Sequence, residues 1–358
     1  MSHERAVMGW DVGGAHLKVA LAQAGSLRQV AQMHTPLWRG LEQLDRAMAA
    51  LAARFPLGQC RHRVTMTGEL ADIFATRADG VAALIQRFCA HLGSAETEIY
   101  AGPKGLLAPD AALHRHHWVA SANWHASAAW IARRFEHALF VDIGSTTTDV
   151  ATVRGGRAQA LGWSDRERMQ EDELVYTGVV RTPAYALAER APFEGAWMGL
   201  AAEQFATAAD VYRLTGELPA HADLGETADG RGKGEAESAA RLARMLGADA
   251  VAGEPHQWRS LAGYFRQCQM ERIWRACVRR CSAGLPEDAP LVGAGVGRFL
   301  MPELALRLGR VHVDWLDLIG QGDDAPSRRA GAGADAGDCA PAVALALLPS
   351  SGTANGPA

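Results

Sequence analysis

The sequence lacks the patterns of several common protein classes. Its six cysteines include no CxxC pair, which favours packing cysteines in a reducing cytosol. No GxxxxGKS/T motif occurs, so a P-loop is excluded. No apolar run approaches the roughly 20 residues that span a bilayer. The polar start MSHER leads at once into a short apolar strand, unlike a secretory signal. We therefore expect a cytoplasmic protein without a membrane partner.

The chain also has little excess of charge. Its 358 residues carry a formal net charge of −4, which gives no reason to expect a nucleic-acid partner. With 48% hydrophobic and 21% charged residues the composition is typical of a folded chain. The length predicts two lobes, because a single hydrophobic core usually stops growing at a smaller size. A small anionic ligand is compatible with this balance, since its binding needs only local charge.

An internal repeat is the most informative pattern. Residues 10–25 (WDVGGAHLKVALAQAG) match residues 141–156 (VDIGSTTTDVATVRGG) at a constant offset of 131. The offset aligns Asp11 with Asp142 and Gly13 with Gly144. A short apolar strand precedes each copy, and a second strand-like run follows each bend, most clearly at 146–153. Each copy therefore predicts a β-hairpin with Asp and Gly at its bend, and the chain holds two related halves.

The remaining segments alternate helices with strands. Apolar residues at helical spacing predict a helix around 41–55, and helices are also expected at 236–246, 258–281, 302–308 and 341–348. Strands are expected at 291–295 and 311–318. These elements predict an α/β protein of two lobes with a cleft between them. The expected division is an N-terminal lobe over 1–136, a C-terminal lobe over 137–348 with a mobile loop at 320–337, and a disordered tail over 349–358.

The hairpin bends have the composition of a phosphate site. At Gly13-Gly14 and Gly144-Ser145 a strand must bend sharply, where glycine permits φ > 0 and lets backbone N–H groups approach an anion. A dinucleotide fingerprint is disfavoured, because a strand rather than a helix follows the first glycines. Hydroxyl donors follow the second bend at Ser145, Thr146 and Thr147. We predict that both bends bind phosphate.

Two aspartates end the strands that precede the bends. Asp11 and Asp142 would hold Mg²⁺ through bound waters if they faced one another across a ligand, which is the usual way in which Mg²⁺ meets phosphate. Either aspartate could instead cap its turn. Because the pair is duplicated, we favour the catalytic and metal-binding role.

A third glycine-rich element follows the strand expected at 291–295. It reads VGAGVGR and contains Gly293, Gly295 and Arg298. Its position between a buried strand and a helix would suit an adenine-like group or a phosphate, with Arg298 as a fork for phosphate oxygens. A glycine-lined turn without a ligand is the alternative.

Taken together, the elements at 9–22, 140–153 and 291–298 resemble those of the actin/hexokinase/Hsp70 ATPase superfamily. Several further segments resemble its hydantoinase/oxoprolinase-like members: TGELAD at 67–72, SANW at 121–124, VDIGSTTTD at 141–149, DRERMQEDELVYTGVVRTP at 165–183, TADGRGK at 227–233 and CAPAV at 339–343. The resemblance covers roughly residues 5–348. It implies a two-lobed actin-like ATPase fold, ribonuclease H-like and duplicated, with a central cleft.

Within this family the segments look most like a branch of methanofuran-biosynthesis synthases, which serve tetrahydromethanopterin-linked one-carbon metabolism. The resemblance implies a transferase that joins 5-(aminomethyl)-3-furanmethanol diphosphate to the phenol of γ-glutamyltyramine and releases pyrophosphate. The partners would then be a small diphosphate and a phenolic amine, with Mg²⁺ as cofactor and the use of ATP left open. The alternatives are an ATP-dependent small-molecule kinase or amidohydrolase, or a nucleotide switch without enzymatic activity.

The long 165–183 signature supplies further candidates. Its acidic trio 171–173 includes one plausible base, most simply Glu171, with Asp172 at the substrate, although such a trio could also be a solvated face. Arg181 could bind the diphosphate or the glutamyl carboxylate. Lys18 is a candidate phosphate ligand. The second repeat has Asp149 at the corresponding position, and either residue could instead lie on the surface. Asn123 and Lys233 are candidate substrate contacts, the latter in a Gly-rich loop that an ordinary turn would also explain.

Overall fold

The structure, a computed structural model, describes residues 5–319 and 333–349. The predicted tail therefore lies outside the described residues apart from Pro349, as does most of the predicted loop at 320–337. The chain divides into two compact units. Unit 1 comprises 1–138, 151–168 and 314–358, and unit 2 comprises 139–150 and 169–313. This discontinuous division differs from the predicted continuous halves, because the C-terminal helix packs on the first sheet of unit 1.

The first sheet lies in unit 1 and has the order β3-β2-β1-β4-β5-β6. Strand β1 pairs with β2 antiparallel and with β4 parallel. Its strands are Val7–Val12 (β1), His16–Gln23 (β2), Ser26–His34 (β3), Arg61–Met66 (β4), Thr97–Tyr100 (β5) and Leu106–Leu107 (β6).

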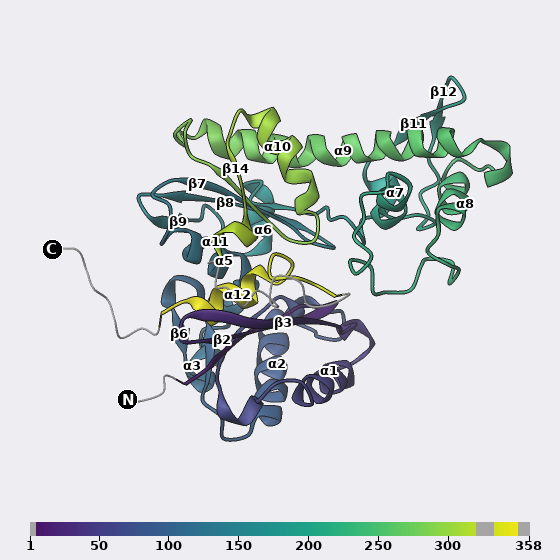
Figure 1. Ribbon diagram of the computed structural model, residues 1–358. Coiled ribbons are helices and arrows are strands. Elements are labelled where there is room, and N and C mark those ends of the chain that lie inside the picture. Colours follow the sequence, from purple (N-terminus) through teal and green to yellow (C-terminus); the bar gives the residue numbers. More distant parts are fainter. Residues whose placement is uncertain (1–4, 320–332, 350–358) are drawn as a thin grey trace. The chain divides into compact units, whose positions relative to one another are not determined.

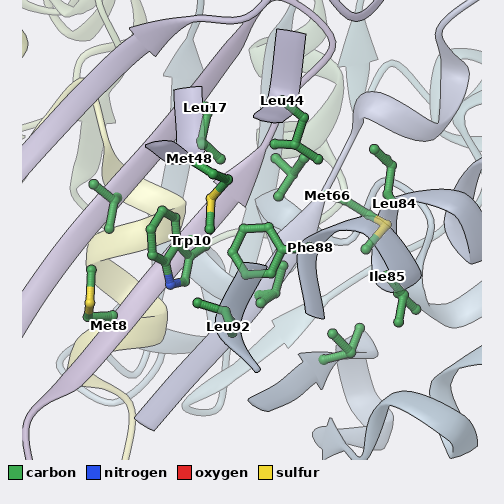
Figure 2. Packing of buried hydrophobic residues seen from close by; sticks show 14 of the residues in the cluster. Met8, Trp10, Leu17, Leu44, Met48, Met66, Leu84, Ile85, Phe88 and Leu92 are labelled. Atoms are coloured by element: carbon green, nitrogen blue, oxygen red, sulfur yellow. The ribbon is translucent and has the colours of Figure 1, made fainter. Parts of the chain in front are cut away.

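Alternation along β1 decides what covers each face of this sheet. Met8, Trp10 and Val12 point to one face, where they join a core with Leu44, Met48 and Phe88 (Figure 2). Gly9 points to the other face, where a Cβ atom would collide with the Ala342 carbonyl of the C-terminal helix. The helix can thus lie directly on β1 only because residue 9 has no side chain.

Helices cover both faces of the first sheet, with α12 on one and α1 and α2 on the other (Figure 1). The buried Arg63 side chain donates to the Leu345 carbonyl at 3.1 Å, near the end of α12 where free carbonyls accumulate. The α-helices that lie wholly in unit 1 are Glu42–Ala52 (α1), Arg77–Leu92 (α2), Pro109–Leu113 (α3), His116–Val119 (α4), Asn123–Ile131 (α5), Trp315–Leu318 (α11) and Ala340–Leu347 (α12). Helix Asp165–Gln170 (α6) begins there.

The second sheet has the order β10-β8-β7-β13-β14, and β9 also pairs with β8. Its central strand β7 is parallel to β13, and β8 is antiparallel to β9. The path β9-β8-β7-β13-β14 therefore repeats the path β3-β2-β1-β4-β5 of the first sheet. Its strands are Ala138–Ile143 (β7), Thr148–Arg154 (β8), Arg157–Gln159 (β9), Leu174–Val175 (β10), Leu291–Ala294 (β13) and His312–Asp314 (β14).

Unit 2 also carries a small helical extension. The 28-residue helix α9 packs with α10 and with α7, and α7 packs with α8 (Figure 1). A hairpin of β11 and β12 packs on α9. These elements are Arg190–Phe193 (β11), Ala196–Gly199 (β12), Ala208–Leu214 (α7), Glu235–Met245 (α8), Pro255–Ser282 (α9) and Met301–Leu308 (α10).

Short 3-10 helices complete the described chain: Leu37–Arg39 (η1), Leu57–Gln59 (η2), Gly68–Leu70 (η3), Gly102–Lys104 (η4), Ala184–Ala186 (η5), Ala250–Ala252 (η6) and Arg298–Leu300 (η7).

Most predicted elements are confirmed, including the helices at α1, α8, α9, α10 and α12 and the buried strand at β13. The strand predicted over 311–318 is wrong in its second half. Only His312–Asp314 is a strand, and α11 starts directly after it. The Asp314 carboxylate accepts from the Leu316 N–H at 2.9 Å, so this residue caps a helix that an apolar pattern alone cannot distinguish from a strand.

Candidate phosphate turns and a buried carboxyl group

The two repeated bends have the same backbone hydrogen bond. In the first turn (residues 11–16) the Gly13 N–H donates to the His16 carbonyl at 3.0 Å. In the second turn (residues 142–147) the Gly144 N–H donates to the Thr147 carbonyl at 2.9 Å. Donor and acceptor are both displaced by the predicted offset of 131 residues. The predicted repeat is thus also a structural repeat, in which both turns have the same backbone hydrogen bond.

The expectation that glycine supplies φ > 0 at these bends is wrong. Gly13, Gly14 and Gly144 are absent from the described residues with positive φ. Gly13 is needed instead for close approach, because a Cβ atom there would lie 2.9 Å from the His16 carbonyl oxygen. The backbone at this bend is not in the left-handed region, so glycine is required there because it has no Cβ atom and not because it tolerates a positive φ.

The first turn carries a buried aspartate at the end of β1. Asp11 is 5% exposed and lies directly across from Lys18 in the antiparallel pairing of β1 with β2. In the parallel pairing with β4 it lies beside Thr65. The first turn therefore carries an aspartate and a lysine at paired positions of adjacent strands.

A second segment contacts the first turn from the end of β4. The Thr67 N–H donates to the Val12 carbonyl at 3.0 Å. A Cβ atom at Gly68 would lie 3.1 Å from the same carbonyl oxygen, so the two backbones are in contact. Glu69 follows directly in η3, and its side chain is 1% exposed. The parallel pairing of β1 and β4 thus places Glu69, which carries a buried carboxyl group, in the segment that contacts the predicted phosphate turn.

Only one oxygen of the Glu69 carboxyl group has a partner among the described residues. The Ser121 hydroxyl donates to Oε1 at 2.9 Å, whereas the buried Oε2 accepts no hydrogen bond. Burial raises the pKa of Glu69 to about 7, because desolvation outweighs the stabilisation of the carboxylate by its own backbone N–H and by the Ser121 hydroxyl. Two nearby charged groups act in opposite directions: Asp165 raises this pKa and Arg77 lowers it. Those two form an ion pair with each other at 3.0 Å.

Backbone strain coincides with this carboxyl group. Ser121 has a φ of 52°, which is the left-handed region that non-glycine residues rarely adopt. Its side chain is buried and makes the hydrogen bond to Glu69. Asn123, two residues further on, is half-buried and begins α5, where its Oδ1 accepts from the Trp124 N–H at 2.8 Å.

The second turn is surrounded by backbone and hydroxyl groups. The Val180 and Arg181 N–H groups donate to the Ser145 carbonyl at 3.1 and 2.9 Å. The Val179 N–H donates to the Gly144 carbonyl at 3.1 Å. A Cβ atom at Gly178 would lie 2.5 Å from the backbone of Ser145 and Thr146. The segment 178–181 therefore lies directly against the second turn, and Gly178 must be glycine for it to do so.

The glycine-rich element at 293–298 reaches the same turn. Gly295 has a φ of 86°, and a Cβ atom there would collide with Asp142 Oδ1 and the Ile143 carbonyl. The Gly297 N–H donates to that carbonyl at 2.8 Å. In unit 2 the structure thus brings together Asp142, the second turn, segment 178–181 and Arg298, whose guanidinium donates to the Gly295 carbonyl at 3.2 Å. Gly293 lies within β13, where it makes room for Met301.

A buried glutamine on α9 holds segment 178–181 in place. Gln269 is 0% exposed, and its Nε2 donates to Thr177 Oγ1 at 2.7 Å and to the Gly178 carbonyl at 2.9 Å. Its Oε1 accepts from the Tyr212 hydroxyl at 2.6 Å, and burial raises the pKa of that tyrosine. All the hydrogen-bonding groups of this amide are used within unit 2, so its role is to position the backbone beside the second turn.

The other predicted residues lie elsewhere in unit 2. Glu171 and Asp172 each pair with Arg279 at 2.8 Å, and Glu173 lies 3.9 Å from Arg280. Lys233 donates to the Asp223 carbonyl at 2.8 Å, in a loop that Asp229 ties to α8 through Arg241 and Arg244. Arg181 is exposed, and its backbone joins the second turn. The roles assigned to these residues stay predictions.

The donor set is compatible with Mg²⁺ held together with a phosphate ligand. Among residues 5–319 and 333–349, no three His, Cys, Asp or Glu side chains could hold a metal ion by themselves. Mg²⁺ commonly takes one or two protein carboxylates and completes its coordination with water and substrate phosphates. Asp11 and Asp142 each offer one such carboxylate at a predicted phosphate turn. In the described part of the chain, no helix is long and apolar enough to cross a membrane.

Four residues of these sites were not predicted from the sequence. Glu69, Ser121, Gly178 and Gln269 each lie far along the chain from the turn or group that they contact. A weak signal existed for three of them: TGELAD and SANW were recognised as segments, and Gly178 lies within the long signature. Gln269 gave none, because a polar residue within a helix pattern is ordinarily exposed.

Comparison with known proteins agrees with this geometry. The family model "Hydantoinase/oxoprolinase" matches residues 61–316. The (4-{4-[2-(gamma-L-glutamylamino)ethyl]phenoxymethyl}furan-2-yl)methanamine synthase of Methanocaldococcus jannaschii is 28% identical over 244 residues, covering 68% of this chain and 72% of that protein. The synthase of the same name from Methanococcus vannielii is 30% identical over 114 residues, covering 32% of this chain and 51% of that protein.

A nucleotide-free structure of acetone carboxylase aligns with a TM-score of 0.50 and 10% identity, over 81% of this chain and 65% of its own. At this identity the likeness concerns the fold alone. Together with the repeated strand order of the two sheets, it confirms the predicted duplicated ribonuclease H-like fold of the actin-like ATPases.

Proposed function

The chain belongs to the hydantoinase/oxoprolinase family, and from this premise we propose that it is a transferase of methanofuran biosynthesis. It joins 5-(aminomethyl)-3-furanmethanol diphosphate to the phenol oxygen of γ-glutamyltyramine and releases pyrophosphate. The product is an aryl ether of the kind that the printed name of the Methanocaldococcus jannaschii synthase describes, with a phenoxymethyl link to a furan.

The observation that carries this proposal is the similarity to that synthase, which extends over 72% of its length. The aligned proteins are therefore of comparable extent. The structural repeat is the physical counterpart of this similarity, since it supplies two turns with the same backbone hydrogen bond, each preceded by an aspartate. Such turns suit a ligand that carries two phosphates.

Stabilising the leaving group is the main chemical task of this reaction. The furan-methyl carbon develops positive charge as its bond to the diphosphate breaks, while negative charge accumulates on the diphosphate oxygens. Preorganised N–H and O–H donors stabilise such charge best. The second turn offers Ser145, Thr146 and Thr147 as hydroxyl donors directly after Gly144, and Arg298 belongs to the glycine-rich element packed on the same turn. We assign phosphate binding to these groups of unit 2 and, separately, to Gly13, Gly14 and Lys18 of the first turn in unit 1.

Asp11 and Asp142 are the residues that would hold Mg²⁺. When bound, the ion neutralises diphosphate charge and makes pyrophosphate a better leaving group. The second substrate requires other contacts, for which Asn123, Asp172, Lys233 and Arg181 are the candidates. That both turns act on a single diphosphate stays a prediction.

The test is an assay of the purified full chain with the furan diphosphate, γ-glutamyltyramine and Mg²⁺. We expect the ether by mass spectrometry and one pyrophosphate released per ether, without any consumption of ATP. Replacing Asp142→Asn should reduce the rate at least tenfold at limiting Mg²⁺. Substrate-dependent release of ADP or phosphate from ATP, with no ether formed, would contradict the proposal and favour an ATP-dependent kinase or amidohydrolase.

A further inference from the structure

We propose that Glu69 is the catalytic base of the ether-forming step, and that its Oε2 atom accepts the proton of the substrate phenol. This inference rests on the proposed function and adds to it a residue, an atom and a direction of proton transfer.

One oxygen of the Glu69 carboxyl group is buried without a hydrogen-bond partner among the described residues. Among the described residues, Oε2 of Glu69 is buried and accepts no hydrogen bond, while Oε1 accepts from Ser121 at 2.9 Å. Buried polar atoms in folded proteins nearly always have a partner, because leaving one unsatisfied costs free energy. A carboxyl oxygen kept in this condition is ready for a donor that arrives with the substrate, and a phenol hydroxyl is such a donor.

Glu69 belongs to the segment that contacts the first turn. Glu69 comes directly after the two residues whose backbone contacts the first turn, at Val12. A base for this reaction must lie near the diphosphate, because the phenol oxygen attacks the carbon to which the diphosphate is attached. The pairing of the parallel strands β1 and β4 places Glu69 in the chain segment that follows this contact.

Ser121, which donates to Glu69, has a strained backbone. Its left-handed backbone, with a φ of 52°, is unfavourable for a residue with a Cβ atom. This conformation accompanies the hydroxyl that donates to Glu69. Strained residues of this kind persist where the surrounding structure compels them, and they concentrate at functional sites. The strain at Ser121 therefore supports a functional role for the Glu69–Ser121 pair.

The ionisation of Glu69 suits the task. A general base works best when its pKa lies near the working pH, and burial raises the pKa of Glu69 to about 7. The charged groups that face it are Asp165 of α6 and Arg77 of α2, which also pair with one another. The acidic trio at 171–173 is less suited, because each of its carboxylates already faces Arg279 or Arg280.

The step balances as follows. The phenol O–H bond breaks, and its proton passes to Oε2 of the Glu69 carboxylate. The phenol oxygen forms a bond to the furan-methyl carbon, while the bond from that carbon to the diphosphate oxygen breaks and its electron pair leaves with pyrophosphate. The neutral Glu69 then returns its proton to water. No oxidant, reductant or further reactant is needed.

The experiment compares kcat and KM over pH 5–9 for the wild-type chain and four variants. In the wild type we expect kcat to fall tenfold per unit of pH below the pKa of Glu69, about 7. Glu69→Gln should lose roughly 10²–10⁴-fold in kcat together with this acid limb. Glu69→Asp should keep the limb at a reduced rate. Ser121→Ala should move the limb to higher pH, because the hydroxyl stabilises the carboxylate.

Glu96→Gln is the matched control, since Glu96 is an exposed glutamate of unit 1 that pairs with Arg61 at 2.8 Å and lies 3.9 Å from Arg5. Its kcat and acid limb should equal those of the wild type. Binding of inorganic pyrophosphate to Glu69→Gln should stay within about threefold of the wild type, which shows that the turn is intact. If Glu69→Gln does not fold, Glu69→Asp and Ser121→Ala decide: an unreduced kcat in Glu69→Asp together with an unmoved acid limb in Ser121→Ala overturns the proposal.

Three results separate this inference from the proposed function. A wild-type chain that forms no ether refutes the proposed function, whatever the variants do. Ether formation by the wild type with an unchanged kcat and acid limb in Glu69→Gln refutes the inference alone. A raised KM with unchanged kcat also refutes it, because Glu69 would then bind a substrate ammonium group instead of accepting a proton.

Discussion

The two turns share the same backbone hydrogen bond but lie in different chemical surroundings. In each, a glycine N–H donates to the carbonyl three residues on, at 3.0 Å in the first turn and 2.9 Å in the second. The first turn lies beside a lysine and the buried carboxyl group of Glu69. The second lies against hydroxyls and two backbone segments that depend on Gly178 and Gly295. Both copies carry an aspartate; the first has the buried Glu69 in the adjoining segment, and the second has hydroxyl residues in the turn itself with glycine backbone packed against it.

This difference separates two tasks. Backbone N–H groups and hydroxyls do not change their protonation near neutral pH, so they suit the binding of phosphate charge. A buried carboxyl group does change its protonation, and it suits proton transfer. The hairpin itself provides only the bend, whereas the segments that pack beside it decide the chemistry.

The largest expected effect comes from filling the space beside the second turn. In Gly178→Ala the new Cβ atom would lie 2.5 Å from the backbone of Ser145 and Thr146, so segment 178–181 must move away from the turn. We expect ether formation to fall about 10²–10³-fold, as when donors to a developing charge are displaced. Gly263→Ala on α9 is the matched control in unit 2, because nothing lies within 4 Å of its Cβ position. A loss in Gly263→Ala as large as that in Gly178→Ala would show that the effect does not come from the second turn.

The next effect concerns the stability cost of the buried carboxyl group beside the first turn. Burial raises the pKa of Glu69 from 4.5 to about 7. The contribution of the protonated group to the free energy of unfolding is therefore fully present below pH 4.5 and is lost as the pH rises through 7. Urea unfolding of the wild type at pH 8 should therefore lose about 3 kcal/mol relative to pH 4.5 through this group, and Glu69→Gln should be spared that loss.

The sign of this effect distinguishes two roles for Glu69. If its carboxylate served to stabilise the fold, Glu69→Gln would be less stable than the wild type at pH 8. We expect the reverse, with a more stable and less active variant, as is common where a site is kept at the expense of stability. Glu96→Gln, measured at both pH values, provides the baseline for an exposed glutamate.

A smaller effect is expected from the amide that supports the second turn. Gln269→Leu removes the donor to Thr177 and Gly178 and leaves the buried Tyr212 hydroxyl without its acceptor. The free energy of unfolding should fall by about 2 kcal/mol, and the affinity for pyrophosphate should fall with it. Gln86→Leu on the exposed side of α2 is the control. Equal stability of the two variants would show that the amide does not hold the segment.

The smallest effect is expected at the surface pair of Glu171 with Arg279. Both side chains are partly exposed and lie 2.8 Å apart. Arg279→Gln should reduce the free energy of unfolding by less than about 1 kcal/mol, because exposed ion pairs contribute little. It should also leave the acid limb of the pH–rate profile in place. A displaced limb would instead assign the phenol proton to the acidic trio, because the same variant removes the nearer arginine of Glu171 and the arginine partner of Asp172.

Much of the fold was predictable from local patterns. The helices at α1, α8, α9, α10 and α12 and the strand β13 followed from apolar spacing, because that spacing reports which face is buried. The strand expected at 311–318 failed at Asp314, where a helix cap of one residue overrides the apolar pattern. The φ > 0 expected at the bends failed for a related reason, since glycine can also be required by close approach alone.

The candidate site was only half predictable. The turns, their aspartates and their hydroxyls lie close together in sequence, so a repeat at an offset of 131 residues reveals them. The partners of these turns come from distant segments: Glu69 arrives through the pairing of β4 with β1, and Gln269 arrives from the middle of α9. Nothing in their own neighbourhood distinguishes them from an ordinary helix or turn residue.

The amino-acid order by itself therefore determined the two hairpins, the α/β class and the family. Each of these rests on contacts between residues near one another or on a repeated local pattern. Tertiary structure alone decided that one glutamate would be buried with an unused oxygen and a strained serine beside it. Burial and desolvation depend on every segment that surrounds a group, and most of those segments are distant in the chain.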